Sequence, residues 1–214
     1  GAGALLAASG RRLADAGATT VLIGTNLMHK VAPAVEAALD VPLLHIADAV
    51  GAAAQRRGFD RLAIVGTKWV MGETFYADRL ARFGISTVAP AKERHDVLDA
   101  IIFDELTQGV VTDASRAIFV AEIEKLAAQG AQAVVLACTE IELLISPKDS
   151  PLPVLDSMAT HAHAAAEACR GGVARSHIVS YAEDGALLTE LFTRGGGGTL
   201  VSQEQFEVVR EATI

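Results

Sequence analysis

Short apolar segments alternate with longer, Ala-rich segments along most of this chain. The short segments are rich in β-branched residues and almost continuously apolar, which is typical of strands covered on both faces. The predicted strands are Thr20–Gly24, Leu43–Ile46, Arg61–Gly66, Ser86–Ala89, Ala133–Ala137 and Pro153–Leu155. The Ala-rich segments predict helices at residues 3–17, 31–39, 47–57, 73–83, 95–108, 115–129 and 158–170.

This alternation indicates an α/β fold with mostly parallel sheets, because helical crossovers usually connect parallel strands. Four glycines strengthen the prediction of where helices end. Gly17, Gly58, Gly84 and Gly130 each follow a helical segment and precede a strand, which suits residues that stop a helix.

Two segments of the chain resemble each other. Ala16–His29 reads AGATTVLIGTNLMH, and Gln129–Glu142 reads QGAQAVVLACTEIE. Each has a Gly-Ala pair, an apolar strand and then a small polar cluster, so we infer an internal duplication with two related lobes. Ligands of open α/β sheets bind beyond the carboxyl ends of strands. We therefore expect Thr25–Asn26 to lie opposite Cys138–Thr139.

Composition narrows the class of protein. Of 214 residues, 51% are hydrophobic and 21% are charged, which is a globular mixture. The net charge is −8 and Lys and Arg are not clustered, so we expect no nucleic-acid partner. No apolar run approaches the roughly 18–20 residues that span a bilayer, so we expect no membrane association. The first residues lack the pattern of a signal peptide and the two cysteines make no disulfide framework, so we expect a cytoplasmic protein.

The character of the sequence changes near residue 170. Ala-rich regularity gives way to Gly-rich and polar sequence, including Gly195–Gly198. We predict a domain of residues 1–170 followed by a C-terminal extension of residues 171–214.

Cys138 is the strongest candidate for chemistry. It follows a predicted buried strand, and a helix start after it would expose the sulfur and favour the thiolate. The alternative is a core cysteine, because free cysteines are often buried. Cys169 lies late in an Ala-rich helix and is expected to serve packing or to lie at the surface.

Other polar residues have structural alternatives. Thr25, Asn26 and Thr67 could each form a turn or cap a helix, and His29 could belong to a site or act as a cap. The histidines and cysteines do not have metal-ligand spacing, and no glycine-rich phosphate loop occurs. We expect neither a metal nor a cofactor.

The blocks GTNLMHK (Gly24–Lys30), LLHIADA (Leu43–Ala49), LAIVGTKWVM (Leu62–Met71) and VVLACTEIELLI (Val134–Ile145) together resemble the aspartate/glutamate racemase family. The resemblance covers roughly residues 1–170. It implies two pseudo-related flavodoxin-like lobes, a small-molecule amino-acid or dicarboxylate substrate, and a homodimer. The implied reaction is deprotonation and reprotonation at Cα without pyridoxal phosphate or metal.

The resemblance also implies roles for individual residues. Two cysteines usually flank the substrate in this family; here Cys138 keeps one position and Thr25 occupies the other. Because a thiol is a far better base than an alkyl hydroxyl, proton abstraction should be faster from the Cys138 side. Substrate-binding roles fall on Asn26, Thr67 and Thr139, and Glu140 would orient its surroundings.

Three departures from the family keep alternatives open. The strand and glycine-rich loop that open most members have no counterpart, so the first lobe is expected to be incomplete. Leu27 and Val70 stand where many relatives have threonine. A related single-cysteine arylmalonate decarboxylase or maleate isomerase is therefore an alternative, and so is an inactive truncated or fused remnant.

The C-terminal segment Ser176–Ile214 has a second resemblance. The run DGALLTELFTR (Asp184–Arg194), with the Gly-rich stretch and threonine after it, is similar to the end of the amino-acid-kinase-like domain of N-acetylglutamate synthases. We expect this tail either to add a strand to a sheet edge or to form a loosely packed hairpin.

Overall fold

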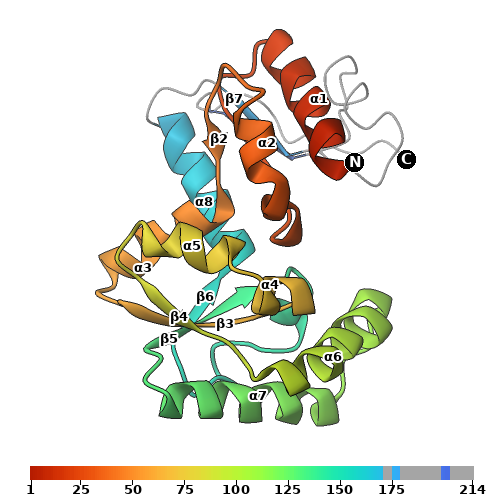
Figure 1. Ribbon diagram of the computed structural model, residues 1–214, viewed down its shortest axis with the longest axis vertical. Coiled ribbons are helices and arrows are strands. Elements are labelled where there is room, and N and C mark those ends of the chain that lie inside the picture. The colour runs from red at the N-terminus through yellow and green to blue at the C-terminus, as the bar shows by residue number, and fades with distance from the viewer. Residues whose placement is uncertain (171–174, 179–198, 203–214) are drawn as a thin grey trace. The chain divides into compact units, whose positions relative to one another are not determined.

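The computed structural model describes residues 1–170, 175–178 and 199–202 (Figure 1). Its contacts divide the chain into two compact units. The larger unit comprises Thr25–Lys30 and Ile46–His161. The smaller unit comprises Gly1–Gly24, Val31–His45 and the described residues from Ala162 onward. The segment that contains Thr25 and Asn26 thus belongs to the same unit as Cys138.

The larger unit contains a four-stranded parallel sheet in the order β4-β3-β5-β6. Its strands are β3 (Arg61–Gly66), β4 (Ser86–Val88), β5 (Ala133–Ala137) and β6 (Val154–Asp156). The central strands β3 and β5 pair from Leu62↔Ala133 to Gly66↔Ala137. Every residue of β5 is buried, as a strand covered on both faces requires.

Helices cover both faces of this sheet, and alternate residues of β3 and β5 point to opposite sides. On one face, α6 (Lys92–Ala100) and α7 (Asp113–Ala128) enclose a core with the side chains Ala63, Val65, Val134 and Leu136. On the other face, α3 (Ile46–Arg56) and α5 (Phe75–Ala81) enclose a core with the side chains Leu62, Ile64, Ala133, Val135 and Ala137. Figure 1 shows α7 on one side of the sheet and α3 and α5 on the other.

Several short elements complete the larger unit. Helix α4 (Lys68–Gly72) follows β3, and α6 continues into a π-helical turn (Ile101–Glu105) and a 3-10 turn (Leu106–Gln108). Helix α8 (Ser157–Arg170) starts directly after β6 and runs into the smaller unit. Further 3-10 helices are Leu27–Val31 and Ile141–Leu143.

The smaller unit is built around a two-stranded parallel sheet of β1 (Val21–Leu22) and β2 (Leu43–Leu44). Helix α1 (Ala2–Asp15) packs on α2 (Ala32–Glu36) and on the residues that follow α2. Gly10 of α1 permits this approach, because a Cβ at this position would lie 3.0 Å from a methyl carbon of Leu39.

The sequence predicted all the strands of these two parallel sheets, within one or two residues at each end. The glycine prediction is confirmed too: each of Gly17, Gly58, Gly84 and Gly130 has a positive φ between 72° and 99°. The helix predictions need correction in three places. Helix α4 was missed, the predicted helix 95–108 starts at Lys92 and changes type at Ile101, and α2 is shorter than predicted.

The described part of the tail forms an antiparallel pair. Strand β7 (Arg175–Ile178) pairs with β8 (Thr199–Ser202), and neither joins another described strand. Whether the tail adds a strand to a sheet edge or forms a hairpin stays a prediction, because most of residues 171–214, including the connection between these two strands, lie outside the described residues. The Asp184–Arg194 motif lies outside the described residues. None of the described helices combines the length and apolarity needed to cross a bilayer.

Candidate functional site

Cys138 lies directly after β5, at the carboxyl end of a central strand. The side chain is half-buried and packs against the core that α6 and α7 cover. Its thiol donates a hydrogen bond to Glu140 Oε2, with an Sγ–O distance of 3.0 Å. The sulfur is thus neither fully buried nor fully exposed, and the Glu140 carboxylate lies beside it.

The protonated thiol is the stable form of Cys138 in this structure. Burial raises the pKa of the thiol to about 12, aided by the hydrogen bond to Glu140 and by the negative charges of Glu140 and Asp99. The sequence predicts a helix start that favours the thiolate. That expectation is wrong, because the turn leads only into the short 3-10 helix Ile141–Leu143, whose dipole is too small to oppose burial.

Glu140 is the proton acceptor beside this thiol. Burial pushes its pKa upward, but hydrogen bonds from Cys138, from the Thr139 side chain and from its own backbone outweigh that effect. The net pKa of Glu140 lies below its ordinary value, so the group is a carboxylate at neutral pH. Thr139, for which the resemblance to the racemase family implies a substrate-binding role, therefore also helps to hold Glu140.

Thr25 is exposed, and its hydroxyl already has one role. Oγ1 accepts a hydrogen bond of 3.2 Å from the backbone N–H of Met28, at the start of the 3-10 helix Leu27–Val31. The capping interpretation of Thr25 is thus observed. The bond occupies a lone pair and leaves the hydroxyl proton available to another acceptor.

Two buried side chains fix the turn around Thr25. Asn26 Nδ2 donates to Ser157 Oγ at 2.9 Å, and Ser157 Oγ donates to the carbonyl oxygen of Leu136 at 2.7 Å. His29 contacts the carbonyl oxygen of Thr25 through Nδ1 at 2.7 Å and accepts from the N–H of Ile46 through Nε2 at 3.2 Å. Because Nε2 accepts, Nδ1 carries the proton of the imidazole.

Asn26 and Thr67 share an unusual property. Each is buried, with exposed fractions of 3% and 6%, and neither Asn26 Oδ1 nor Thr67 Oγ1 has a hydrogen-bond partner among the described residues. Thr67 stands at the N-cap position of α4 without using its side chain as a cap. Leaving such an atom unpaired costs about 1–3 kcal/mol, so both atoms favour a polar ligand at their positions.

Asp99 and Ser157 are polar groups of this region that sequence reasoning missed. Asp99 of α6 is buried, and its Oδ1 accepts from the backbone N–H of Lys68 at 2.9 Å. The same carboxylate influences the Cys138 thiol, so Asp99 links the start of α4 to the region of the sulfur. A hydrophobic pattern cannot reveal such residues, because their partners lie far away in the sequence.

The turns after β1 and β5 follow the same course, as the internal similarity predicted. In each, a strand ends, a polar pair follows, and a 3-10 helix begins. Thr25 corresponds to Cys138 and Asn26 corresponds to Thr139 in this comparison.

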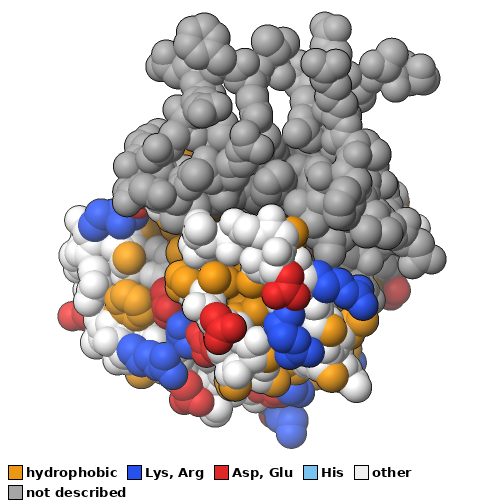
Figure 2. Space-filling model, turned by 90° about the horizontal axis from the view of Figure 1, so that it is seen from above, with side chains coloured by type: hydrophobic (Ala, Val, Ile, Leu, Met, Phe, Trp, Pro, Cys, Tyr) orange, Lys and Arg blue, Asp and Glu red, His pale blue; other side chains and the backbone are white. Residues whose placement is uncertain are grey.

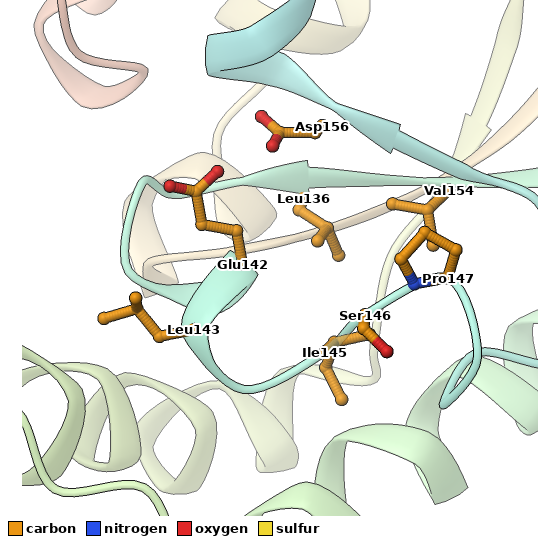
Figure 3. A pocket seen from close by; sticks show the side chains of 8 residues that line it. All are labelled: Leu136, Glu142, Leu143, Ile145, Ser146, Pro147, Val154 and Asp156. Atoms are coloured by element: carbon orange, nitrogen blue, oxygen red, sulfur yellow. The ribbon is translucent and has the colours of Figure 1, made fainter.

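A pocket of about 430 Å³ lies between this region and β6 (Figure 3). Its lining includes Glu142 and Asp156, whose carboxyl groups point toward each other in Figure 3. The hydrogen bond to Asp156, followed by burial and the charges of Asp156 and Glu140, raises the pKa of Glu142 to about 7. None of the residues that the sequence assigned to the site lines this pocket.

Leu27 and Val70, which stand where many relatives have threonine, both pack in the core of this structure. Val70 is buried in the core that α3 and α5 cover, and Leu27 packs against the same cluster. The residues described bring together no group of three or more side chains suited to a metal ion. On the described part of the face in Figure 2, acidic and basic side chains lie interspersed with hydrophobic ones.

Comparison with known proteins gives a consistent result over most of the chain. A sequence profile of the family described as Asp/Glu/Hydantoin racemase matches residues 1–165. A Yersinia pestis protein assigned to the Asp/Glu racemases is 40% identical, with a TM-score of 0.74 over 78% of this chain and 73% of that one. An aspartate racemase homologue from Pyrococcus horikoshii is 30% identical, with a TM-score of 0.68 over 76% of this chain and 71% of that one.

A second similarity concerns a short stretch of the chain. A stretch of 51 residues, or 24% of this chain, is 98% identical to the amino-acid acetyltransferase of Pseudomonas putida. The matched stretch spans 12% of that acetyltransferase.

Proposed function

Because this chain belongs to the Asp/Glu/hydantoin racemase family, we propose that it racemises an acidic amino acid, aspartate or glutamate, without a cofactor. Cys138 and Thr25 would act on opposite faces of the substrate α-carbon. The observation that carries the proposal is the hydrogen bond from the Cys138 thiol to an ionised Glu140. This pair supplies a sulfur acid–base group together with an acceptor for its proton.

On the Cys138 side, Glu140 takes the thiol proton and the thiolate removes the α-proton of the substrate. The pKa of the thiol, raised to about 12, must fall for this step to be efficient. The substrate itself provides the means, because its α-ammonium group is a cation, and a nearby cation stabilises a thiolate. In this proposal the thiolate forms when the ammonium group of the bound amino acid lies nearer to the sulfur than its carboxylates do.

On the other side, the Thr25 hydroxyl donates a proton to the carbanion and recovers one from water, and the hydroxide that remains takes the proton that Glu140 had accepted from the thiol. The hydrogen bond from Met28 N–H stabilises negative charge on Oγ1 during this transfer. A hydroxyl remains a much poorer acid and base than a thiol, so the reaction is asymmetric. Abstraction from the Cys138 side is the faster direction.

Substrate binding draws on the unpartnered atoms. Asn26 Oδ1 and Thr67 Oγ1 lack a described partner, and the substrate ammonium and carboxylate are groups that satisfy them. Polar groups held near the α-carbon also stabilise the carbanion, whose formation is the costly step.

The direct test is exchange of the α-proton in deuterated water, followed by proton NMR with each enantiomer of aspartate and glutamate. The wild-type chain should exchange at least one of these amino acids, and Cys138→Ala should reduce the rate by roughly 10²–10⁴-fold. Cys169→Ala is the matched control, because it removes the other thiol. The proposal fails if the wild-type chain exchanges none of the four substrates, or if Cys138→Ala exchanges as fast as Cys169→Ala.

A further inference from the structure

The two hydrogen bonds that join Asn26 to β5 have a fixed direction. The carbonyl oxygen of Leu136 can only accept, so the Ser157 hydroxyl must use its one proton on that bond. Ser157 Oγ can then only accept from Asn26, and only the NH₂ group of the Asn26 amide can donate to it. The direction of both bonds therefore follows from a backbone carbonyl.

This direction determines which atom Asn26 offers to a ligand. With Nδ2 held by Ser157, the remaining polar atom is Oδ1, which only accepts hydrogen bonds. Asn26 is 3% exposed, and no described residue donates to Oδ1. Ser157 is completely buried and Leu136 is 1% exposed, so water does not compete with these bonds.

We infer that Ser157 is a positioning residue that holds the Asn26 amide with its oxygen toward the ligand, and so reserves that position for an ammonium group. The inference rests on the proposed function and extends it to the choice of substrate class. An amino acid can donate to Asn26 Oδ1. A dicarboxylate without an amino group would set oxygen against oxygen.

Thr67 does not provide the same selectivity. Its unpartnered Oγ1 belongs to a hydroxyl, which can donate or accept, and therefore tolerates either a carboxylate or an ammonium group. Asn26 therefore discriminates between amino acids and simple dicarboxylates, and Ser157 determines the orientation of the Asn26 amide. The arrangement disfavours the arylmalonate and maleate alternatives that the sequence left open.

The test compares two ligands that differ only in the amino group. Racemic aspartate and succinate are titrated into the full chain by calorimetry; the racemate ensures that turnover causes no net change. The wild-type chain should bind aspartate more tightly. In Ser157→Ala the amide is free to turn, so the ratio of the two dissociation constants should fall about tenfold, the effect of one hydrogen bond to a charged group.

Three further variants separate positioning from stability. Ser157→Thr keeps the hydroxyl and should keep the ratio. Ser157→Cys keeps nearly the same volume with a poor acceptor, and should lower the ratio even if Ser157→Ala does not fold. Ser150→Ala is the matched control, because Ser150 donates to the carbonyl oxygen of Leu152 without joining another side chain. Thermal melting checks that each variant is folded.

The outcomes distinguish the two claims. If the wild-type chain prefers aspartate but Ser157→Ala and Ser157→Cys keep the same ratio, the role of Ser157 is overturned and the proposed function stands. The same conclusion follows if both ligands weaken equally. If the wild-type chain prefers succinate, or binds neither of these ligands and no racemic glutamate either, the amino-acid substrate fails together with the inference.

Discussion

At the scale of single residues, the proton in the hydrogen bond between Cys138 and Glu140 is expected to control the reactivity of the thiol. Glu140→Gln removes a negative charge and an acceptor that both help to raise the thiol pKa to about 12, although burial remains the larger cause. We predict that the variant reacts faster with iodoacetamide at pH 8, by roughly tenfold for each unit by which the pKa falls. Its α-proton exchange should instead slow, because the thiol proton has lost its acceptor.

The measurement is the pH dependence of alkylation, followed by mass spectrometry in a Cys169→Ala background. Faster alkylation with slower exchange is the signature of an acid–base pair. Alkylation at an unchanged or lower rate would show that Glu140 does not hold the thiol in its protonated form.

In the proposed reaction, Thr25 sets the balance between the two faces of the substrate. Thr25→Cys replaces a weak acid and base by a thiol, so exchange of the enantiomer that Thr25 deprotonates should accelerate and the two enantiomers should exchange at more similar rates. Thr25→Ser, which keeps a hydroxyl, should preserve the asymmetry. The check is the ratio of initial exchange rates for L- and D-substrate. An unchanged ratio in Thr25→Cys would remove Thr25 from the reaction.

At the scale of elements, regular features were predictable and tertiary ones were not. Strands β3 and β5 are continuous apolar runs, and Gly17 and Gly130 mark helix ends through a conformation that other residues adopt at a cost. Helix α4 is too short to show a helical period. Its first N–H bonds to Asp99, which lies 31 residues further along the chain. A local pattern carries no sign of such a contact.

The candidate site shows the same limit. The positions of Cys138 and Thr25 at strand ends follow from the order of strands and polar clusters. The pKa of the thiol depends on the depth of burial and on two carboxylates, Glu140 and Asp99, whose arrangement requires coordinates. Ser157 was a helix-start serine by pattern alone, and only its bonds to Asn26 and Leu136 reveal more.

The pair of carboxyl groups formed by Glu142, after β5, and Asp156, in β6, should make the stability of the fold depend on pH. The pKa of Glu142 is raised from its ordinary 4.5 to about 7, mainly by the hydrogen bond to Asp156, so the folded chain keeps this proton to higher pH than the unfolded chain. The stabilisation is complete below about pH 4.5 and is lost as the pH rises toward 7. In this window the pair makes stability decrease with pH.

Glu142→Gln should remove this trend, because an amide donates to Asp156 at every pH in the range. The melting temperature of the variant minus that of the wild type should increase between pH 4.5 and 7 and then level off. The gain should be about 1–2 °C, since Glu142 is exposed and solvent screens the pair. Glu93→Gln, on the exposed side of α6, controls for the loss of one negative charge. A difference that is constant with pH would contradict the shared proton.

At the scale of the whole molecule, the two compact units differ in how firmly their sheets are held. In the larger unit, β3 and β5 pair over five residues between two buried cores. In the smaller unit, β1 and β2 pair over only two residues, from Val21↔Leu43 to Leu22↔Leu44. Small two-stranded sheets have only marginal stability, and the least buried elements of a protein unfold locally first. Hydrogen exchange followed by mass spectrometry should therefore find the slowest amides in β3 and β5, and much faster exchange in β1 and β2.

The turn with Asn26 and His29 belongs to the larger unit and should exchange slowly with it, because its buried hydrogen bonds lead to β5 and α3. Ser157→Ala should accelerate exchange in this turn while β3 keeps its protection. Equal protection in β1 and β5, or a turn that exchanges with β1 in the wild-type chain, would contradict this ranking and detach Asn26 from the strand that leads to Cys138.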